Sequence, residues 1–299
     1  MNVTRRGFQS NLVPSWMDPI FVLFLMLNLG VWNVRGLNTP VKQREVRDLI
    51  FSHKLACLGL VETKIKVDSL AIVAKSIMPG WNCLSNHFCS PDGHIVVIWN
   101  PFLLVVEPLL ESSQIIECLV RAVKVDIACL ISFVYGSYSV ADRRLLWDVI
   151  SSRASPSQSV PCMLSGDFNV VRFPDDRLRG CLDWAASMED CNTGIVEANL
   201  EDLRSSDLRF SWRKGNTGVM RKLDRAPVSS AWLSCFPASI ADFLPFGLSD
   251  HTPVIIRVGM DLNSGKPPFK FFNHWADYDG FLDSVALSWN VRVAGCKMF

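Results

Sequence analysis

The chain lacks three features that would assign it quickly to a class of protein. It carries ten cysteines but no CxxC pair, so we interpret the thiols as reduced and buried in the core of an intracellular protein, not as zinc ligands or disulfides. Its formal net charge is only +1, so any nucleic-acid binding must use a local basic patch. With 49% hydrophobic and 20% charged residues, the sequence is typical of a globular protein.

A long apolar run is the third missing feature. The most apolar stretch, residues 19–33, contains only eight consecutive apolar side chains, whereas a membrane-spanning helix needs about 20. Two arginines precede this stretch as in a signal peptide, but a proline and an aspartate intervene and no A-x-A-like cleavage site follows. We therefore expect a soluble chain with no membrane partner, an N-terminal extension over residues 1–25 and a buried strand near residues 27–32.

Apolar runs and amphipathic segments alternate between residues 26 and 259, which we interpret as one folded domain. Buried strands are expected at residues 27–32, 56–62, 94–99, 115–123, 126–135 and 160–166, and shorter strands follow from residue 208. Helices are expected at residues 39–54, 139–153 and 184–199. Because both hairpins and crossovers join the strands, we expect an α/β domain with two packed sheets. Residues 260–299 indicate a linker and one truncated connector helix.

A polar residue interrupts the apolar pattern at the end of most predicted strands. These residues are Asn33, Glu62, Tyr135, Asp167, Asn169, Asp224, Asp250 and His251. Each has an ordinary structural explanation by itself, such as a turn cap, a surface ion pair or a satisfied core histidine. Buried carboxylates are costly unless they are paired or bind a metal, and sites are commonly built where strands end. We therefore expect these side chains to form one site.

Oxygen donors dominate this set, which favours a magnesium or manganese ion over zinc. Glu62 and Asp250, aided by Asn33, are the candidate ligands. Such an ion can neutralise a phosphate and a leaving oxyanion. This part of the set therefore predicts a metal-assisted reaction at a phosphate group.

The other polar residues fit proton transfer and charge stabilisation. Asp167 is a candidate base for an attacking water, and Asn169 can donate its amide to a phosphate oxygen or hold that water. His251 can donate a hydrogen bond to the phosphoryl charge, with Asp224 fixing its tautomer. The strand period of two predicts that Asp167 and Asn169 share one face while Phe168 packs behind. Together these roles describe metal-assisted hydrolysis of a phosphodiester.

Six short segments carry these residues, and their order along the chain resembles that of the endonuclease/exonuclease/phosphatase superfamily. They read WNVRGLN, LGLVETK, FVYGS, LSGDFNVV, RKLDR and LSDHTPV. The segments WNVRGLNTPVKQREV and ETKI look most like the endonuclease domain of plant LINE-type non-LTR retrotransposons. The chain contains no YADD- or FADD-like motif, so we expect no reverse transcriptase activity.

This resemblance implies a fold and an activity. The implied fold is a four-layer sandwich in which two mixed β-sheets pack face to face and helices lie outside. The implied activity is Mg²⁺-dependent nicking of DNA that leaves a 3′-hydroxyl, in the nucleus, with Tyr135 near the scissile phosphate. The superfamily also includes phosphatases, so a phosphatase or phosphodiesterase acting on a small or lipid phosphate is an alternative, and an inactive transposon relic is another.

A basic hairpin is the sequence feature that favours DNA over a small substrate. Residues 209–225 carry six basic side chains against one acid, in a chain whose total charge is +1. We expect DNA contacts from Arg213, Lys214, Arg221 and Lys222, and from Ser211, which stands where the resembling family more often has threonine. A solvated turn with a core tryptophan is the alternative explanation of the same segment.

Overall fold

The structure is a computed structural model that describes residues 27–123, 127–152, 160–180, 185–259 and 280–289. The chain divides into two compact units between Asn263 and Ser264, and each is considered by itself. The first unit holds all the predicted site residues. In the second, helix α7 (Phe281–Trp289) falls within the predicted connector. The predicted extension over residues 1–25 and most of the predicted linker lie outside the described residues.

One mixed sheet contains the first predicted strand. In order across the sheet, its strands are β11 (Ser205–Asp207), β16 (Ile240–Phe243), β17 (Val254–Arg257), β1 (Asn28–Asn33), β2 (Leu55–Val61), β4 (Ile95–Trp99) and β3 (Asn82–Ser85). β1 and β2 run parallel, and helix α2 (Pro40–His53) connects them. Thr39 caps this helix, because its Oγ1 accepts the N–H of Lys42 at 3.4 Å.

A second mixed sheet contains the strand that ends in Asp167. Its order is β10 (Leu200–Asp202), β15 (Pro227–Ser229), β8 (Cys162–Asp167), β7 (Ala128–Tyr135), β6 (Ile115–Ala122) and β5 (Leu104–Glu111). β14 (Asp224–Arg225) also pairs with β8, beside this path. β6 and β7 pair antiparallel, whereas β7 and β8 run parallel with helix α4 (Val140–Ser151) between them in the chain.

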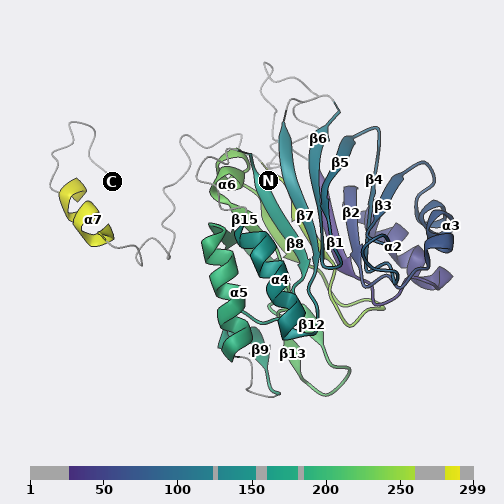
Figure 1. The fold of residues 1–299 in the computed structure, drawn as a ribbon. Coiled ribbons are helices and arrows are strands. Elements are labelled where there is room, and N and C mark those ends of the chain that lie inside the picture. Colours follow the sequence, from purple (N-terminus) through teal and green to yellow (C-terminus); the bar gives the residue numbers. More distant parts are fainter. Residues whose placement is uncertain (1–26, 124–126, 153–159, 181–184, 260–279, 290–299) are drawn as a thin grey trace, which may run out of the picture. The chain divides into compact units, whose positions relative to one another are not determined.

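The two sheets pack face to face, and helices lie on their outer sides (Figure 1). Gly59 of β2 lies against the ring of Phe133 from β7, and a Cβ at this position would overlap that ring. Helices α2 and α3 (Val67–Ile77) share one apolar cluster with the first sheet. Helices α4 and α5 (Ala185–Glu197) share another with the second sheet. The predicted four-layer α/β sandwich is therefore confirmed.

The cysteines follow the predicted pattern for core thiols in most positions. All eight in the described part are free, and five of them are buried: Cys57, Cys118, Cys129, Cys162 and Cys191. Burial is the main cause that raises the pKa of Cys118 and Cys129 to about 12, which makes these thiols unreactive near neutral pH. No helix among the described residues is both long enough and apolar enough to cross a bilayer.

Candidate active site

Four strands from the two sheets deliver polar side chains to one edge of the sandwich. β1 and β2 run parallel in one sheet, as do β7 and β8 in the other, so each pair has its carboxyl ends together. β1 ends at Asn33, β7 at Tyr135 and β8 at Asp167, and Glu62 follows β2 directly. All four side chains are buried. The prediction that polar residues close these strands is confirmed, and their contacts show how they meet.

Asn33 joins the two sheets at this edge. Its Nδ2 donates to Asp167 Oδ2 at 2.8 Å and to Glu62 Oε2 at 3.2 Å, and it lies 3.4 Å from His251 Nε2. Its Oδ1 accepts the backbone N–H of Arg35 at 3.0 Å, which fixes the orientation of the amide. The Asn33 side chain is completely buried. It therefore links Glu62, Asp167 and His251 away from solvent.

Asp224, His251 and Asp167 form a line of interacting groups beside Asn33. His251 Nδ1 lies 2.8 Å from Asp224 Oδ2, and its Nε2 lies 3.7 Å from Asp167 Oδ2. β14 places Asp224 opposite Asp167 of β8, which explains why two carboxylates approach the same imidazole. Ligand-capable atoms of the three residues all lie within 4.8 Å of one another, so this buried group can hold a metal ion.

Burial and charge shift the pKa values of two members of this line, Asp167 and His251, in useful directions. Burial is the main cause that raises the pKa of Asp167 to about 6, with the charge of His251 opposing it and that of Asp224 adding to it. Burial alone would lower the pKa of His251, but the charges of Asp224 and Asp167 outweigh it and raise that pKa to about 9. Between these two values Asp167 is an ionised acceptor while His251 is a protonated donor.

Asn169 reaches the site by a turn, which corrects the reasoning from strand periodicity. β8 ends at Asp167, and Asn169 has a left-handed backbone conformation with φ of 50°. Asp167 Oδ1 accepts the Asn169 N–H at 2.8 Å, and Asn169 Nδ2 donates to the Gly136 carbonyl at 2.7 Å. Phe168 packs behind as predicted, because it is fully buried and its ring stacks with that of Trp147. The period of two is therefore wrong here, although both polar side chains belong to the site.

The predicted metal ligands Glu62 and Asp250 are both held by cations. Glu62 Oε1 lies 2.8 Å from Lys64 Nζ, and the Asp250 carboxylate forms an ion pair with Arg35. Asp250 Oδ2 also accepts the Trp212 Nε1–H at 3.0 Å. The other oxygen, Asp250 Oδ1, is buried and has no hydrogen-bond partner. A buried carboxylate oxygen without a donor is a suitable ligand for a hard divalent cation, so the residues fit such an ion.

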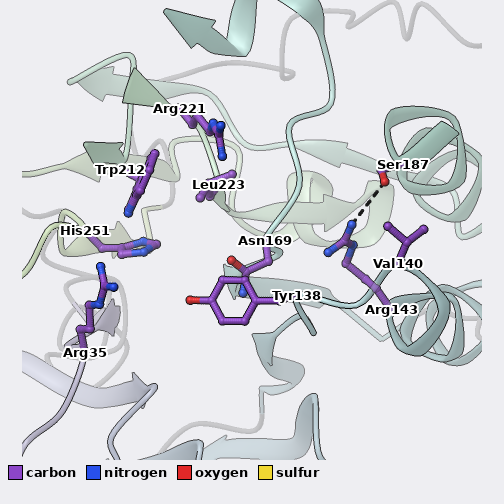
Figure 2. Close-up of a pocket in the computed structure, with 10 residues that line it drawn as sticks. All are labelled: Arg35, Tyr138, Val140, Arg143, Asn169, Ser187, Trp212, Arg221, Leu223 and His251. Atoms are coloured by element: carbon purple, nitrogen blue, oxygen red, sulfur yellow. Dashed lines mark hydrogen bonds between the residues drawn. The ribbon is translucent and has the colours of Figure 1, made fainter. Parts of the chain in front are cut away.

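A cleft of about 320 Å³ opens over His251 and Asn169 (Figure 2). Trp212, Arg221 and Leu223 form one side of it, and Tyr138, Val140, Arg143 and Ser187 the other, with Arg35 near His251. The ring of Tyr135 contacts that of Tyr138 edge to face, with 6.4 Å between the two ring centroids, and burial is the main cause that raises the pKa of Tyr135 well above the ordinary value. Its phenol therefore stays protonated and can donate a hydrogen bond.

The predicted basic hairpin forms and is attached directly to the site. β12 (Trp212–Arg213) pairs antiparallel with β13 (Met220–Arg221), and Trp212 bridges to His251. The N–H of Arg213 donates to the Asp250 carbonyl at 3.0 Å. Arg221 lies over the Trp212 ring at 5.2 Å and lines the cleft. Arg213 and Lys214 are exposed. With Arg221 in the lining of the cleft, three of the predicted DNA contacts can reach a ligand.

Ser211 and Lys222 require a correction to the predicted DNA contacts. Ser211 is completely buried, and its Oγ accepts the N–H groups of Leu223 at 3.0 Å and Asp224 at 2.8 Å. Lys222 is half-buried and packs over the Phe243 ring, and burial is the main cause that lowers its pKa. Ser211 therefore supports the strand that carries Asp224 instead of facing a ligand, whereas half-buried Lys222 offers a ligand less of its side chain than Arg213 or Lys214 does.

Two arginines that the sequence reasoning missed belong to the same basic surface. β9 (Arg177–Leu178) pairs with β13 and makes the hairpin a three-stranded sheet. This pairing places Arg177 opposite Arg221, and it brings exposed Arg179 against Gly218 of the hairpin loop. Their distance from the hairpin in sequence concealed this contact, and the run DDRLRG in the segment after the GDFN motif was the available signal.

Comparison with known proteins adds evidence about the fold. A scan against protein-family models and a search of the curated proteins each found no match. Among solved structures, the AP endonuclease LMAP from Leishmania major is 17% identical, with a TM-score of 0.60 over 84% of this chain and 92% of that chain. The endonuclease domain of TRAS1, a telomere-specific non-LTR retrotransposon, is 12% identical, with a TM-score of 0.57 over 78% and 99% of the two chains.

A mannosyl-6-phosphatase from Bacteroides thetaiotaomicron VPI-5482 is similar to a comparable degree, at 14% identity and a TM-score of 0.52 over 77% of this chain and 98% of that chain. The chain has the fold of the endonuclease/exonuclease/phosphatase family. The resemblance identified from six sequence segments is thereby confirmed at the level of the fold. Because both nucleases and a phosphatase share this endonuclease/exonuclease/phosphatase fold, the choice of substrate depends on the residues around the cleft.

Proposed function

We propose that this protein is a Mg²⁺-dependent endonuclease that nicks DNA and leaves a 3′-hydroxyl, acting in the nucleus as part of a LINE-type retrotransposon. The observation that carries the proposal is the buried line from Asp224 through His251 to Asp167, which lies at the base of a cleft with a basic hairpin on one side. This combination supplies a base, a hydrogen-bond donor and a surface for phosphates.

The metal would be held at the first-sheet end of the site. The Glu62 carboxylate and the unpartnered oxygen of Asp250 are hard donors, and the Asn33 amide contacts Glu62. These donors suit Mg²⁺, with Mn²⁺ as an alternative, and suit zinc less because the described site residues include no cysteine and only one histidine, His251. When bound, the ion would neutralise negative charge on the phosphate and the leaving oxygen.

Asp167, His251 and Tyr135 would take up or donate the protons. Asp167 takes a proton from the attacking water, and two hydrogen bonds to its carboxylate, from Asn33 and from the Asn169 backbone, hold it in place. His251 donates from Nε2 to a phosphoryl oxygen while Asp224 holds Nδ1. Tyr135 contributes a neutral phenol near the same phosphate.

The basic surface favours DNA as the substrate. Arg213, Lys214 and Arg221 come from the hairpin, and Arg177 and Arg179 join them from β9. In a protein of net charge +1, such a concentration of arginine beside one cleft matches a repeated phosphate backbone better than a single phosphate group. A phosphatase acting on a small or lipid phosphate is the second candidate, which the similarity to a mannosyl-6-phosphatase favours.

A substrate panel tests the proposal. Supercoiled plasmid, a sugar phosphate and an inositol phosphate would be incubated with the protein in Mg²⁺, with an EDTA control. Metal-dependent nicking of plasmid without phosphate release from the small substrates would support the endonuclease. Phosphate release without nicking would support the phosphatase, and neither reaction from a folded protein would support an inactive relic.

A further inference from the structure

A second cluster of charged side chains lies directly behind the proposed catalytic residues. Arg225 is 2% exposed, and its guanidinium forms ion pairs with Asp176 and, at 2.7 Å, with Asp202. Arg172, also buried, lies 3.2 Å from the same Asp202 carboxylate. We call these four residues the Arg225 cluster. Its two positive and two negative charges balance, which is the condition for burying them together.

The cluster connects segments that carry site residues. Arg225 follows Asp224 in β14, and because side chains alternate along a strand, one points to Asp176 and Asp202 while the other points to His251. Asp176 lies at the end of the loop that begins after Asp167.

Asp176 also ties the backbone of this loop to the strand that leads into β14. Its Oδ2 accepts the N–H groups of Arg172 at 3.2 Å and Phe173 at 3.0 Å. Its own carbonyl accepts the N–H of Lys222 at 2.8 Å. The loop that contains Asn169 and the strand that contains Asp224 therefore share one buried anchor.

If Arg225 served only to stabilise the fold, an apolar side chain that filled the same space would be sufficient. The cluster instead uses a guanidinium whose Nε is buried and has no partner, and Asp202 leaves one buried oxygen without a donor. Such uncompensated atoms are costly, which a cluster selected for stability alone would avoid. A planar, two-sided guanidinium fixes two carboxylates at once, which a flexible ammonium cannot do equally well.

We propose that Arg225 is a positioning residue for the proposed reaction. By bridging Asp176 and Asp202, it fixes β14 so that Asp224 meets His251 Nδ1, and it fixes the loop that presents Asn169 to the cleft. The inference rests on the proposed function, but its geometric part concerns the contact between Asp224 and His251 and can be measured without catalysis.

The test uses Arg225→Met and Arg225→Lys in the full chain. Steady-state nicking of plasmid DNA in Mg²⁺ would give kcat and KM, and proton NMR would detect the downfield signal of the His251 Nδ1–H that is hydrogen-bonded to Asp224. For Arg225→Met we expect kcat to fall roughly 10- to 100-fold with KM changed by less than about twofold, together with loss or a large shift of that signal. Arg225→Lys should recover part of both.

Arg257→Met is the matched control, because Arg257 also pairs with an aspartate, Asp242, but lies in the first sheet away from the site. It should leave kcat and the signal unchanged. If Arg225→Met fails to fold, Asp202→Asn removes one ion pair of the cluster. Its effect is measured by the same kcat and the same His251 NMR signal.

The proposal is overturned if a folded variant keeps the His251 signal, whether or not kcat falls. If the wild-type protein does not nick DNA, the proposed function fails by itself, and the NMR signal still decides whether Arg225 positions the contact between Asp224 and His251.

Discussion

The candidate site has a buried wall and an exposed wall, which are built in opposite ways. On the buried side, Asn33, Asp167 and His251 are at most 2% exposed, and the Asn33 amide contacts both of the other two side chains. On the other, the basic side chains stand on strands of two residues each, and several are exposed. Chemistry requires a fixed geometry, whereas phosphate contacts tolerate movement. The difference implies that variants in the two walls should separate catalysis from binding.

The largest effect should come from the buried wall. His251→Ala should lower the nicking rate roughly 10²- to 10⁴-fold, because it removes the donor to the phosphoryl oxygen, while the Kd for duplex DNA changes little. Rates under single-turnover conditions and fluorescence anisotropy would measure the two quantities. His53→Ala, on helix α2, is the control and should keep the wild-type rate. If His251→Ala weakened DNA binding as much as it lowered the nicking rate, the proposed separation of catalysis from binding would be contradicted.

The pH should affect catalysis by the buried wall more than DNA binding by the exposed wall. Nicking should rise as Asp167 ionises around a pKa of about 6 and should fall as His251 loses its proton around a pKa of about 9. DNA binding by arginines should stay nearly constant across this range. Because the pKa of His251 is raised in the folded state, its contribution to stability is complete below about 6.5 and is lost as the pH rises through about 9. A flat pH–rate profile of kcat would contradict these assignments.

The exposed wall should control affinity and its dependence on salt. Arg213→Ala combined with Arg179→Ala should weaken DNA binding, and the slope of log K against log salt should become shallower by about 0.9 for each phosphate that is no longer neutralised. The rate at saturating protein should change little. Arg44→Ala on helix α2 serves as the matched control, since it removes an exposed arginine elsewhere. An unchanged salt slope in the double variant would exclude this surface from DNA binding.

The smallest effect concerns Ser211, where the two walls join. Ser211→Ala leaves two buried N–H groups, those of Leu223 and Asp224, without their acceptor and should lower the free energy of unfolding by about 1–3 kcal/mol. Ser211→Thr keeps the oxygen and should lose less. Urea denaturation would compare the three proteins. Equal stability of the alanine variant and the wild type would show that these hydrogen bonds contribute nothing.

Much of the fold and the site could be predicted from the sequence because the information was local. Apolar runs identified the long strands, and a polar residue at the end of a buried strand identified Asn33 and Asp167. The failures involve contacts between distant segments. Arg177 joins the hairpin only through strand pairing, and the burial of Ser211 depends on the backbone of Asp224.

The Arg225 cluster illustrates the same limit. Arg225 appeared in the sequence as one more cation of a basic hairpin, yet in the structure it is buried between two aspartates. Asp176 and Asp202 are far from it along the chain, and no local pattern marks them as its partners. Local reasoning can identify the side chains that carry the chemistry but not those that hold them in place.

The most direct test of the central claim is single-turnover nicking of supercoiled plasmid by the wild-type protein and by His251→Ala, in Mg²⁺ and in EDTA. We predict that the wild type nicks only with the metal and that the variant binds the plasmid with similar affinity but nicks it at least about 100-fold more slowly. Equal nicking by the two proteins would contradict a catalytic role for the line from Asp224 to Asp167.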